Sequence, residues 1–128
     1  MDLKIHESAE NYLETILILK EKLGNVRSVD IANELNYTKP SVSVAMKQFR
    51  ENGYIIIDEN GYISLTKRGS EVAEYVYKRH KLITEMLVRV GVSLETAKED
   101  ACRIEHDISD ETFLKLKEFY EKIISDKK

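Results

Sequence analysis

The sequence has little of what disulfide-stabilised, loop-rich or membrane-spanning proteins are built from. Its 128 residues include one cysteine, one proline, five glycines and no tryptophan. A single cysteine forms no internal disulfide, so we expect the protein in the reducing cytoplasm. No apolar run approaches the roughly 18 residues of a membrane span, and the polar N-terminus lacks the apolar segment of a secretion signal. So few prolines and glycines predict long helices with few loops.

The length allows one compact core, or a small module with a helical extension. Hydrophobic residues make up 42% and charged residues 34%, which is ordinary for a protein with a charged surface. The formal net charge is -3, and residues 1–69 contain nine basic and ten acidic residues. Dedicated DNA-binding domains often carry a basic excess, so the charge taken alone argues mildly against nucleic acid.

Apolar residues at helical spacing predict three helices in the first half of the chain. The predicted helices cover about residues 7–22, 29–35 and 38–52. Ser28 and Thr38 have side chains suited to the N-caps of the second and third helices. A short helix, a turn and a third helix follow in the order of a helix-turn-helix motif.

Two short apolar runs follow the third helix. Residues 54–57 and 62–65 predict two strands, and the Asn60-Gly61 pair predicts a hairpin turn between them. Three helices and then a hairpin are the order of a winged helix-turn-helix, so we expect a DNA-binding domain over residues 1–69. A generic small α+β domain with the same elements is the alternative.

The second half of the chain is predicted to be helical almost to its end. Helices are expected over residues 70–90, 93–108 and 110–124. Three helices do not enclose a large core by themselves, so we expect a core shared across a two-fold axis with a second subunit. The predicted fold is therefore mainly α, with an N-terminal winged helix-turn-helix followed by an α-helical dimerisation domain over residues 70–128.

If its apolar residues face inward, the third helix presents its opposite face to DNA. Serine and lysine reach phosphates and base edges, whereas proline and valine contact thymine methyl groups. The predicted DNA contacts, on this helix and beside it, are Arg27, Thr38, Lys39, Pro40, Ser41, Ser43, Val44, Lys47 and Arg50. Each lysine alone is equally well explained as a solvated surface charge, and their shared face favours DNA binding.

Cys102, Glu105 and His106 lie on one face of a predicted helix, so a thiolate, a carboxylate and an imidazole converge within one turn. This mixed set of donors suits a first-row divalent metal rather than calcium or magnesium. A buried cysteine beside a surface Glu-His pair would have the same spacing. His80 and Glu14 are further possible donors. A lone histidine is more often structural or exposed, and paired acids on a helix more often form a solvated face.

Residues 99–111, Glu-Asp-Ala-Cys-Arg-Ile-Glu-His-Asp-Ile-Ser-Asp-Glu, resemble the metal-binding helix of the diphtheria-toxin-repressor family, the iron- and manganese-dependent transcriptional repressors. Residues 10–16, 66–69 and 79–82 resemble the family's first helix, wing end and linking helix. The resemblance covers essentially the whole chain, and matches a short form without the SH3-like third domain of longer members.

The resemblance implies a set of metal ligands by position. They are Asn11, Glu14, His80, Cys102, Glu105 and His106. The last three match primary ligands of the iron-type branch, His80 matches a histidine of both branches, and Glu14 matches a carboxylate of the manganese-type branch. Asn11 departs from both branches, which have methionine or aspartate there. The thiolate favours Fe(II), with Mn(II) as the alternative, and one or two ions are expected per subunit.

Thr84 and Lys98 also depart from the family, because they stand where the iron-type branch places ancillary ligands. The iron-type second site is therefore doubtful. A paired arrangement in which Glu105 is shared between two ions is the alternative. Two ions would add four positive charges to the net charge of -3, giving about +1, so the acidity fits a repressor that is weak without metal.

The function implied is a metal-activated transcriptional repressor of metal-homeostasis genes, acting as a cytoplasmic homodimer on palindromic operator DNA. The alternative is a winged-helix regulator that responds to a small organic ligand. An enzyme is not expected, because the sequence has no helical His-Glu-x-x-His motif and no recognisable substrate pocket.

Overall fold

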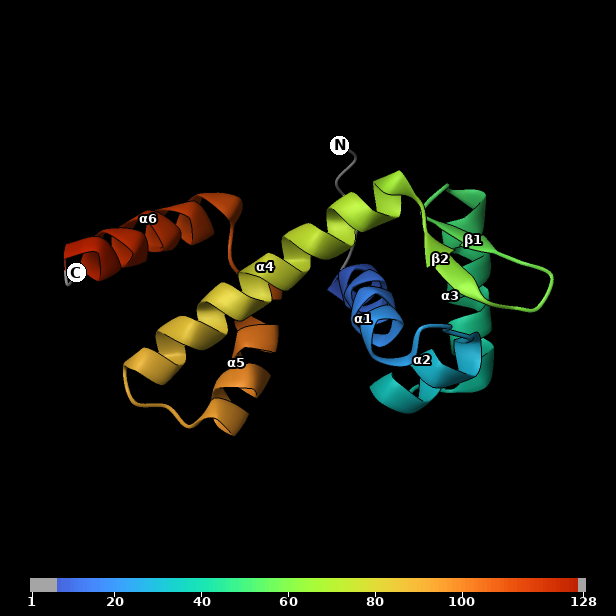
Figure 1. The fold of residues 1–128 in the computed structure, drawn as a ribbon, viewed down its shortest axis with the longest axis horizontal. Coiled ribbons are helices and arrows are strands. Elements are labelled where there is room, and N and C mark those ends of the chain that lie inside the picture. Colours follow the sequence, from blue (N-terminus) through green and yellow to red (C-terminus); the bar gives the residue numbers. More distant parts are fainter. Residues whose placement is uncertain (1–6, 127–128) are drawn as a thin grey trace. The chain divides into compact units, whose positions relative to one another are not determined.

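The computed structural model describes residues 7–126, with side chains from Ala9 onward. Two compact units, residues 1–75 and 76–128, are described separately. The elements, labelled in Figure 1, are α1 (Glu7–Leu23), α2 (Ser28–Leu35), α3 (Lys39–Glu51), β1 (Ile55–Ile57), β2 (Ile63–Leu65), α4 (Lys67–Arg89), α5 (Leu94–Asp107) and α6 (Asp110–Asp126). The predicted winged helix-turn-helix followed by a helical domain is confirmed.

The sequence predicted the N-cap of α3 correctly and the N-cap of α2 wrongly. Thr38 caps α3 as predicted, because its Oγ1 accepts a hydrogen bond from the Ser41 N–H at 3.3 Å. Helix α2 begins one residue earlier than predicted, with Arg27 as its N-cap. The Asp30 carboxylate accepts a bond from the Arg27 N–H at 2.8 Å, which replaces the expected Ser28 cap.

The N-terminal unit has its core between α1, the helix-turn-helix and the hairpin. The most deeply buried side chains are Leu13, Ile16, Val26, Ile31, Val42, Met46 and Ile63. On α3, Val42 and Met46 are buried, whereas Ala45 and Phe49 are only half-buried. The Ile63 N–H donates to the Val26 carbonyl at 2.7 Å, so β2 is tied to the segment that enters α2.

The hairpin pairs β1 and β2 in antiparallel register, with Ile55 opposite Leu65 and Ile57 opposite Ile63. The predicted Asn60-Gly61 turn lies in the loop between the two strands. Among the described hairpin residues only Gly61 has a positive φ, of 83°, and the Asp58 N–H donates to the Tyr62 carbonyl. The loop therefore has three residues, with glycine in the left-handed position.

The Thr-Lys-Arg-Gly segment at residues 66–69 ties the wing to the end of α3. The Thr66 hydroxyl donates to the Gly53 carbonyl at 2.6 Å and accepts from the Gly69 N–H at 3.2 Å. Arg68 donates to the Asn52 carbonyl at 2.9 Å. Thr66, Arg68 and Gly69 therefore each make a hydrogen bond that holds the end of the wing in place.

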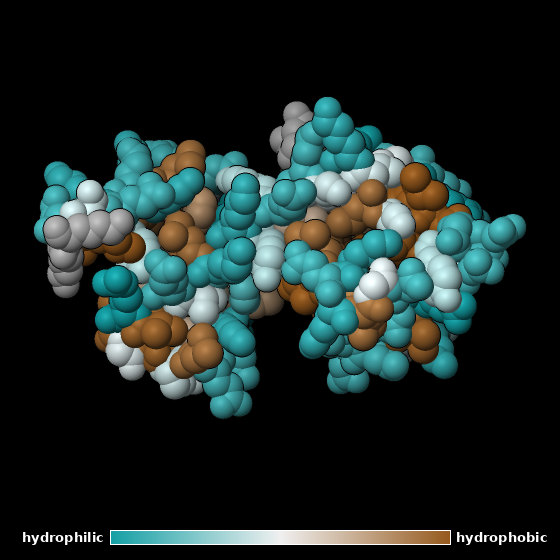
Figure 2. Space-filling model, in the orientation of Figure 1, coloured by the Kyte–Doolittle hydropathy of each residue, from teal (hydrophilic) through white to brown (hydrophobic). Residues whose placement is uncertain are grey.

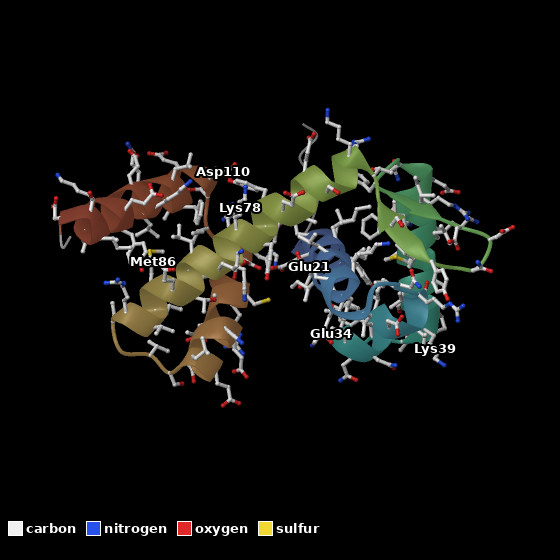
Figure 3. The ribbon with its side chains drawn as sticks, viewed as in Figure 1. Glu21, Glu34, Lys39, Lys78, Met86 and Asp110 are labelled. Atoms are coloured by element: carbon white, nitrogen blue, oxygen red, sulfur yellow. The ribbon has the colours of Figure 1, made fainter. Side chains whose placement is uncertain are left out.

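The C-terminal unit is built from most of α4 together with α5 and α6. Its core is Ile83, Ala101 and Phe113, with Leu82, Met86, Leu87, Ile104 and Ile108 packed around it; Figure 3 labels Met86 on α4. Large apolar side chains also stay exposed on α6, namely Leu114, Leu116, Phe119 and Ile123, and hydrophobic patches interrupt the hydrophilic surface in Figure 2. None of the described helices has both the length and the apolar character of a membrane span.

Candidate metal centre and nucleic-acid interface

Cys102, Glu105 and His106 converge on the last two turns of α5. Each offers one donor atom, and the three atoms lie within 4.8 Å of one another. The arrangement follows from helical geometry, because residues three and four apart share a face. Helix α5 is well defined at its start, where the Ser93 hydroxyl accepts a hydrogen bond from the Thr96 N–H.

Glu105 stands at the centre of the cluster. It is 3% exposed, and its Oε2 lies 3.5 Å from Nδ1 of His80 on α4. Its Oε1 lies 3.4 Å from Nε2 of His106. Within the part of the chain that the structure describes, neither carboxylate oxygen accepts a hydrogen bond. Burying a carboxylate without such a donor is costly, so this group needs a positively charged partner.

The donor set fits a divalent transition-metal ion. His80 and His106 supply imidazole nitrogens, Cys102 supplies a half-buried thiol and Glu105 supplies the buried carboxylate. Nitrogen and sulfur donors favour first-row transition metals, whereas calcium and magnesium favour all-oxygen sites. A divalent ion would also provide the charge that the buried carboxylate requires.

The remaining predicted ligands lie in the N-terminal unit, and the two positions that depart from the family's ancillary ligands lie in the C-terminal unit. Asn11, half-buried, and Glu14, buried, lie three residues apart on α1 in the N-terminal unit. In the C-terminal unit, the Thr84 hydroxyl donates to the His80 carbonyl at 2.8 Å, and Lys98 is exposed on α5. Thr84 therefore supports the α4 backbone at His80. The ligand roles of Asn11 and Glu14 stay predictions.

All nine residues predicted to contact DNA are exposed in the N-terminal unit. Figure 3 labels Lys39 at the start of α3. The Thr38 hydroxyl donates to the Ser41 Oγ at 2.8 Å, so this side chain also stabilises the start of the helix. The Arg27 guanidinium lies 4.6 Å from the centre of the Tyr62 ring. DNA contacts by these residues stay predictions.

Two residues near these sites were missed by sequence reasoning. Tyr62 supports Arg27 through a cation–π contact, and its position in the predicted returning strand gave no sign of this. Arg79 on α4 is buried, and its guanidinium contacts the end of α5, which carries the cluster. The signals for Arg79 were its place immediately before His80 and the resemblance of residues 79–82 to the family's linking helix.

Comparison with known families divides the chain in the same order as the fold. Residues 4–69 match the iron dependent repressor N-terminal DNA binding domain. Residues 66–127 match the iron dependent repressor metal binding and dimerisation domain. Together the two matches cover nearly the whole chain.

Individual relatives agree with these matches. An HTH-type transcriptional regulator of Methanocaldococcus jannaschii is 36% identical over 118 residues, which are 91% of this chain and 94% of the relative. The transcriptional regulator MntR of Escherichia coli is 33% identical over 106 residues, which are 83% of this chain and 68% of MntR.

A solved structure has the same arrangement of elements. The crystal structure of IdeR from T. acidophilum matches with a TM-score of 0.79 at 26% identity. The match covers 88% of this chain and 53% of IdeR, so this chain spans about half the length of that structure.

Proposed function

Because this chain belongs to the diphtheria-toxin-repressor family of metal-dependent transcriptional regulators, we propose that it represses metal-homeostasis genes by binding operator DNA as a homodimer when loaded with Fe(II) or Mn(II). The observation that carries this proposal is the buried Glu105 carboxylate, which has two imidazole nitrogens within 3.5 Å and accepts no hydrogen bond from the described residues. A thiol on the same face completes a transition-metal donor set. When bound, the ion supplies positive charge and bonds to these side chains.

The ligand set supports Fe(II) first and Mn(II) second. Cys102 favours the softer ions of the first-row series, whereas the amide of Asn11 in place of methionine favours harder ones. His80, Cys102, Glu105 and His106 form the proposed set of the C-terminal unit. Asn11 and Glu14 on α1 are its proposed additions.

The proposed DNA-reading surface is the exposed face of α3 with its flanks. Its lysines, serines and arginines are donors for phosphates and base edges. The N-terminal residues 1–69 are not basic overall, so the proposed non-specific affinity is low at physiological salt. Dimerisation and metal loading together would raise the affinity for a palindromic site. The exposed apolar side chains of α6 support an interface with a second copy.

Removing the metal is expected to weaken DNA binding. A palindromic duplex selected in vitro with Mn(II)-loaded protein would be titrated anaerobically by fluorescence anisotropy with Fe(II), with Mn(II) and with excess chelator. Coupling between an effector and a ligand amounts to roughly 5–150-fold in affinity, and we expect at least about tenfold weaker binding in chelator. Equal affinity with and without metal would contradict the proposed switch.

A double variant separates this function from regulation by a small organic ligand. In Cys102→Ala/His106→Ala, the metal-dependent increase in operator affinity is expected to disappear. A variant that kept its full response, or that responded to an organic inducer, would favour the alternative.

Lys47→Ala is expected to reduce DNA affinity through the loss of a phosphate contact. Each phosphate contact contributes about 0.9 to the slope of log affinity against log salt concentration, so the slope should fall by about that amount on specific and random duplexes alike. Lys22→Ala, which removes an exposed lysine from the end of α1, is the matched control with an unchanged slope. An unaltered slope for Lys47→Ala would remove this residue from the proposed interface.

A further inference from the structure

We infer that Arg79 is a positioning residue of the metal centre, which fixes the α5 ligands relative to the α4 ligand. The inference rests on the proposed metal-binding function and assigns a role to a residue that is not itself a ligand. Arg79 is one of three charged residues that are buried, with Glu14 and Glu105, among the residues that the structure describes. A buried guanidinium needs hydrogen-bonded partners to offset the loss of water.

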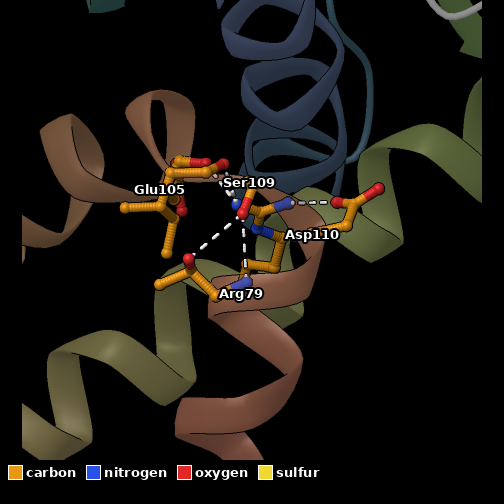
Figure 4. A network of polar contacts seen from close by, with 6 residues as sticks. Arg79, Glu105, Ser109 and Asp110 are labelled. Carbon is orange, nitrogen blue, oxygen red and sulfur yellow. Dashed lines mark hydrogen bonds and ion pairs between the residues drawn. The ribbon is translucent and has the colours of Figure 1, made fainter.

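The partners of Arg79 lie on two other helices of the C-terminal unit. One guanidinium nitrogen, Nη2, donates to the Glu105 carbonyl at 2.7 Å and to the Ile108 carbonyl at 3.4 Å. The other, Nη1, donates to the Asp110 carboxylate at 2.9 Å. Figure 4 shows the guanidinium between the end of α5 and the start of α6.

These contacts satisfy main-chain carbonyl groups at the end of α5. The last carbonyls of a helix have no partner within the helix, and many helices end on a glycine that helps to satisfy them. Helix α5 has no such glycine, because its C-cap is Ile108 in an extended conformation with φ -104°. Arg79 supplies donors instead, and its positive charge lies at the negative end of the helix dipole.

The same side chain connects two proposed ligands. Arg79 precedes His80 on α4, and it donates to the main chain of Glu105, whose carboxylate lies 3.5 Å from the His80 ring. The aromatic ring of Phe113 on α6 lies 4.8 Å from the guanidinium and limits its movement. The planar guanidinium of arginine carries several N–H donors and can bind three such acceptors at once, whereas the ammonium group of lysine is a compact point charge.

The test is Co(II) binding by the full chain, because Co(II) reports ligand geometry through its d–d bands and thiolate coordination through a charge-transfer band. Affinity would be measured anaerobically by competition with a chelator, at a temperature where circular dichroism shows each metal-free variant to be folded. Changing residues that orient metal ligands costs about 10–100-fold in affinity. For Arg79→Gln we expect a loss of about tenfold and altered d–d intensities, with an intermediate loss for Arg79→Lys.

Two further variants make the result decisive. Arg103→Gln changes the charge equally on α5, at a side chain that is 77% exposed, and should bind Co(II) as the wild type does. Asp110→Asn removes the ionic partner of Arg79 at a side chain that is 74% exposed. It should fold and lose affinity in the same direction, so it decides the question if neither Arg79 variant folds.

The positioning role would be overturned if the folded Arg79 variants had the Co(II) affinity and spectrum of the wild type. If these variants do not fold, the same result in Asp110→Asn would overturn it. A purely structural role would lower the melting temperature and leave the Co(II) spectrum unchanged. Failure of the proposed function is distinguishable, because the wild-type chain itself would then bind Co(II) without a thiolate charge-transfer band.

Discussion

Glu105→Gln is expected to abolish metal binding without destabilising the metal-free protein. Changes to residues that only orient ligands already cost about 10–100-fold in affinity, so the loss of the central carboxylate should exceed about 100-fold. The metal-free protein should keep or gain thermal stability, because the substitution removes a carboxylate that is 3% exposed and costly to bury. Co(II) titration and thermal denaturation in chelator would measure the two effects.

The experiment discriminates because metal affinity is expected to fall while the stability of the metal-free protein is kept or rises. Glu99→Gln, at an exposed position on the same helix, makes the same chemical change and should leave both quantities unaltered. If the Glu105 carboxylate were only a structural partner of the imidazoles, its removal would lower stability and spare metal affinity. That result would end the assignment of Glu105 as a ligand.

Gly69→Ala is expected to cost the N-terminal unit about 2 kcal/mol of stability, because a methyl group inserted against packed backbone costs about 3 kcal/mol, the upper end of the usual range, and helix propensity returns about 1 kcal/mol. A Cβ at this position would overlap the Tyr54 carbonyl and come within 3.2 Å of the Leu65 side chain. The carbonyl cannot easily withdraw, since it accepts a hydrogen bond from the Thr66 N–H at 3.0 Å. The clash outweighs the gain of about 1 kcal/mol in helix propensity.

Urea denaturation followed by circular dichroism would measure the effect of Gly69→Ala. Glu71→Ala, at an exposed position in the same part of α4, should change stability by less than about 0.5 kcal/mol. Because the clash involves the backbone entering β1, we also expect weaker operator binding from a displaced wing. A Gly69→Ala protein as stable as the wild type would show that α4 and the wing can separate at no cost.

Helix α3 was predictable because its signals are local. Thr38 caps the first turn of α3, and a proline follows where a missing N–H is harmless. Val42 and Met46 then place the core on one face by helical periodicity. The start of α2 was predicted wrongly, because Arg27 and Ser28 compete for the N-cap. The deciding hydrogen bond is the one that the Arg27 N–H donates to the Asp30 carboxylate.

The candidate metal centre was partly predictable for the same reason. Cys102, Glu105 and His106 converge because their spacing places them on one helical face, which the sequence alone determines. The approach of Glu105 to His80 joins residues 25 positions apart along the chain. No periodicity contains that information, and only the resemblance of residues 79–82 to a known family indicated it.

The low content of proline and glycine predicted the helical character, and the single cysteine left one thiol, which stands among the proposed ligands. Only the tertiary structure decided which distant groups hold the end of α5 and the start of α4 in place. Arg79 lies between α5 and α6, and Gly69 packs under the Tyr54 carbonyl, although neither has a recognisable local pattern. Such contacts depend on which distant groups a folded chain brings within reach, whereas caps and helical faces depend on neighbours along the chain.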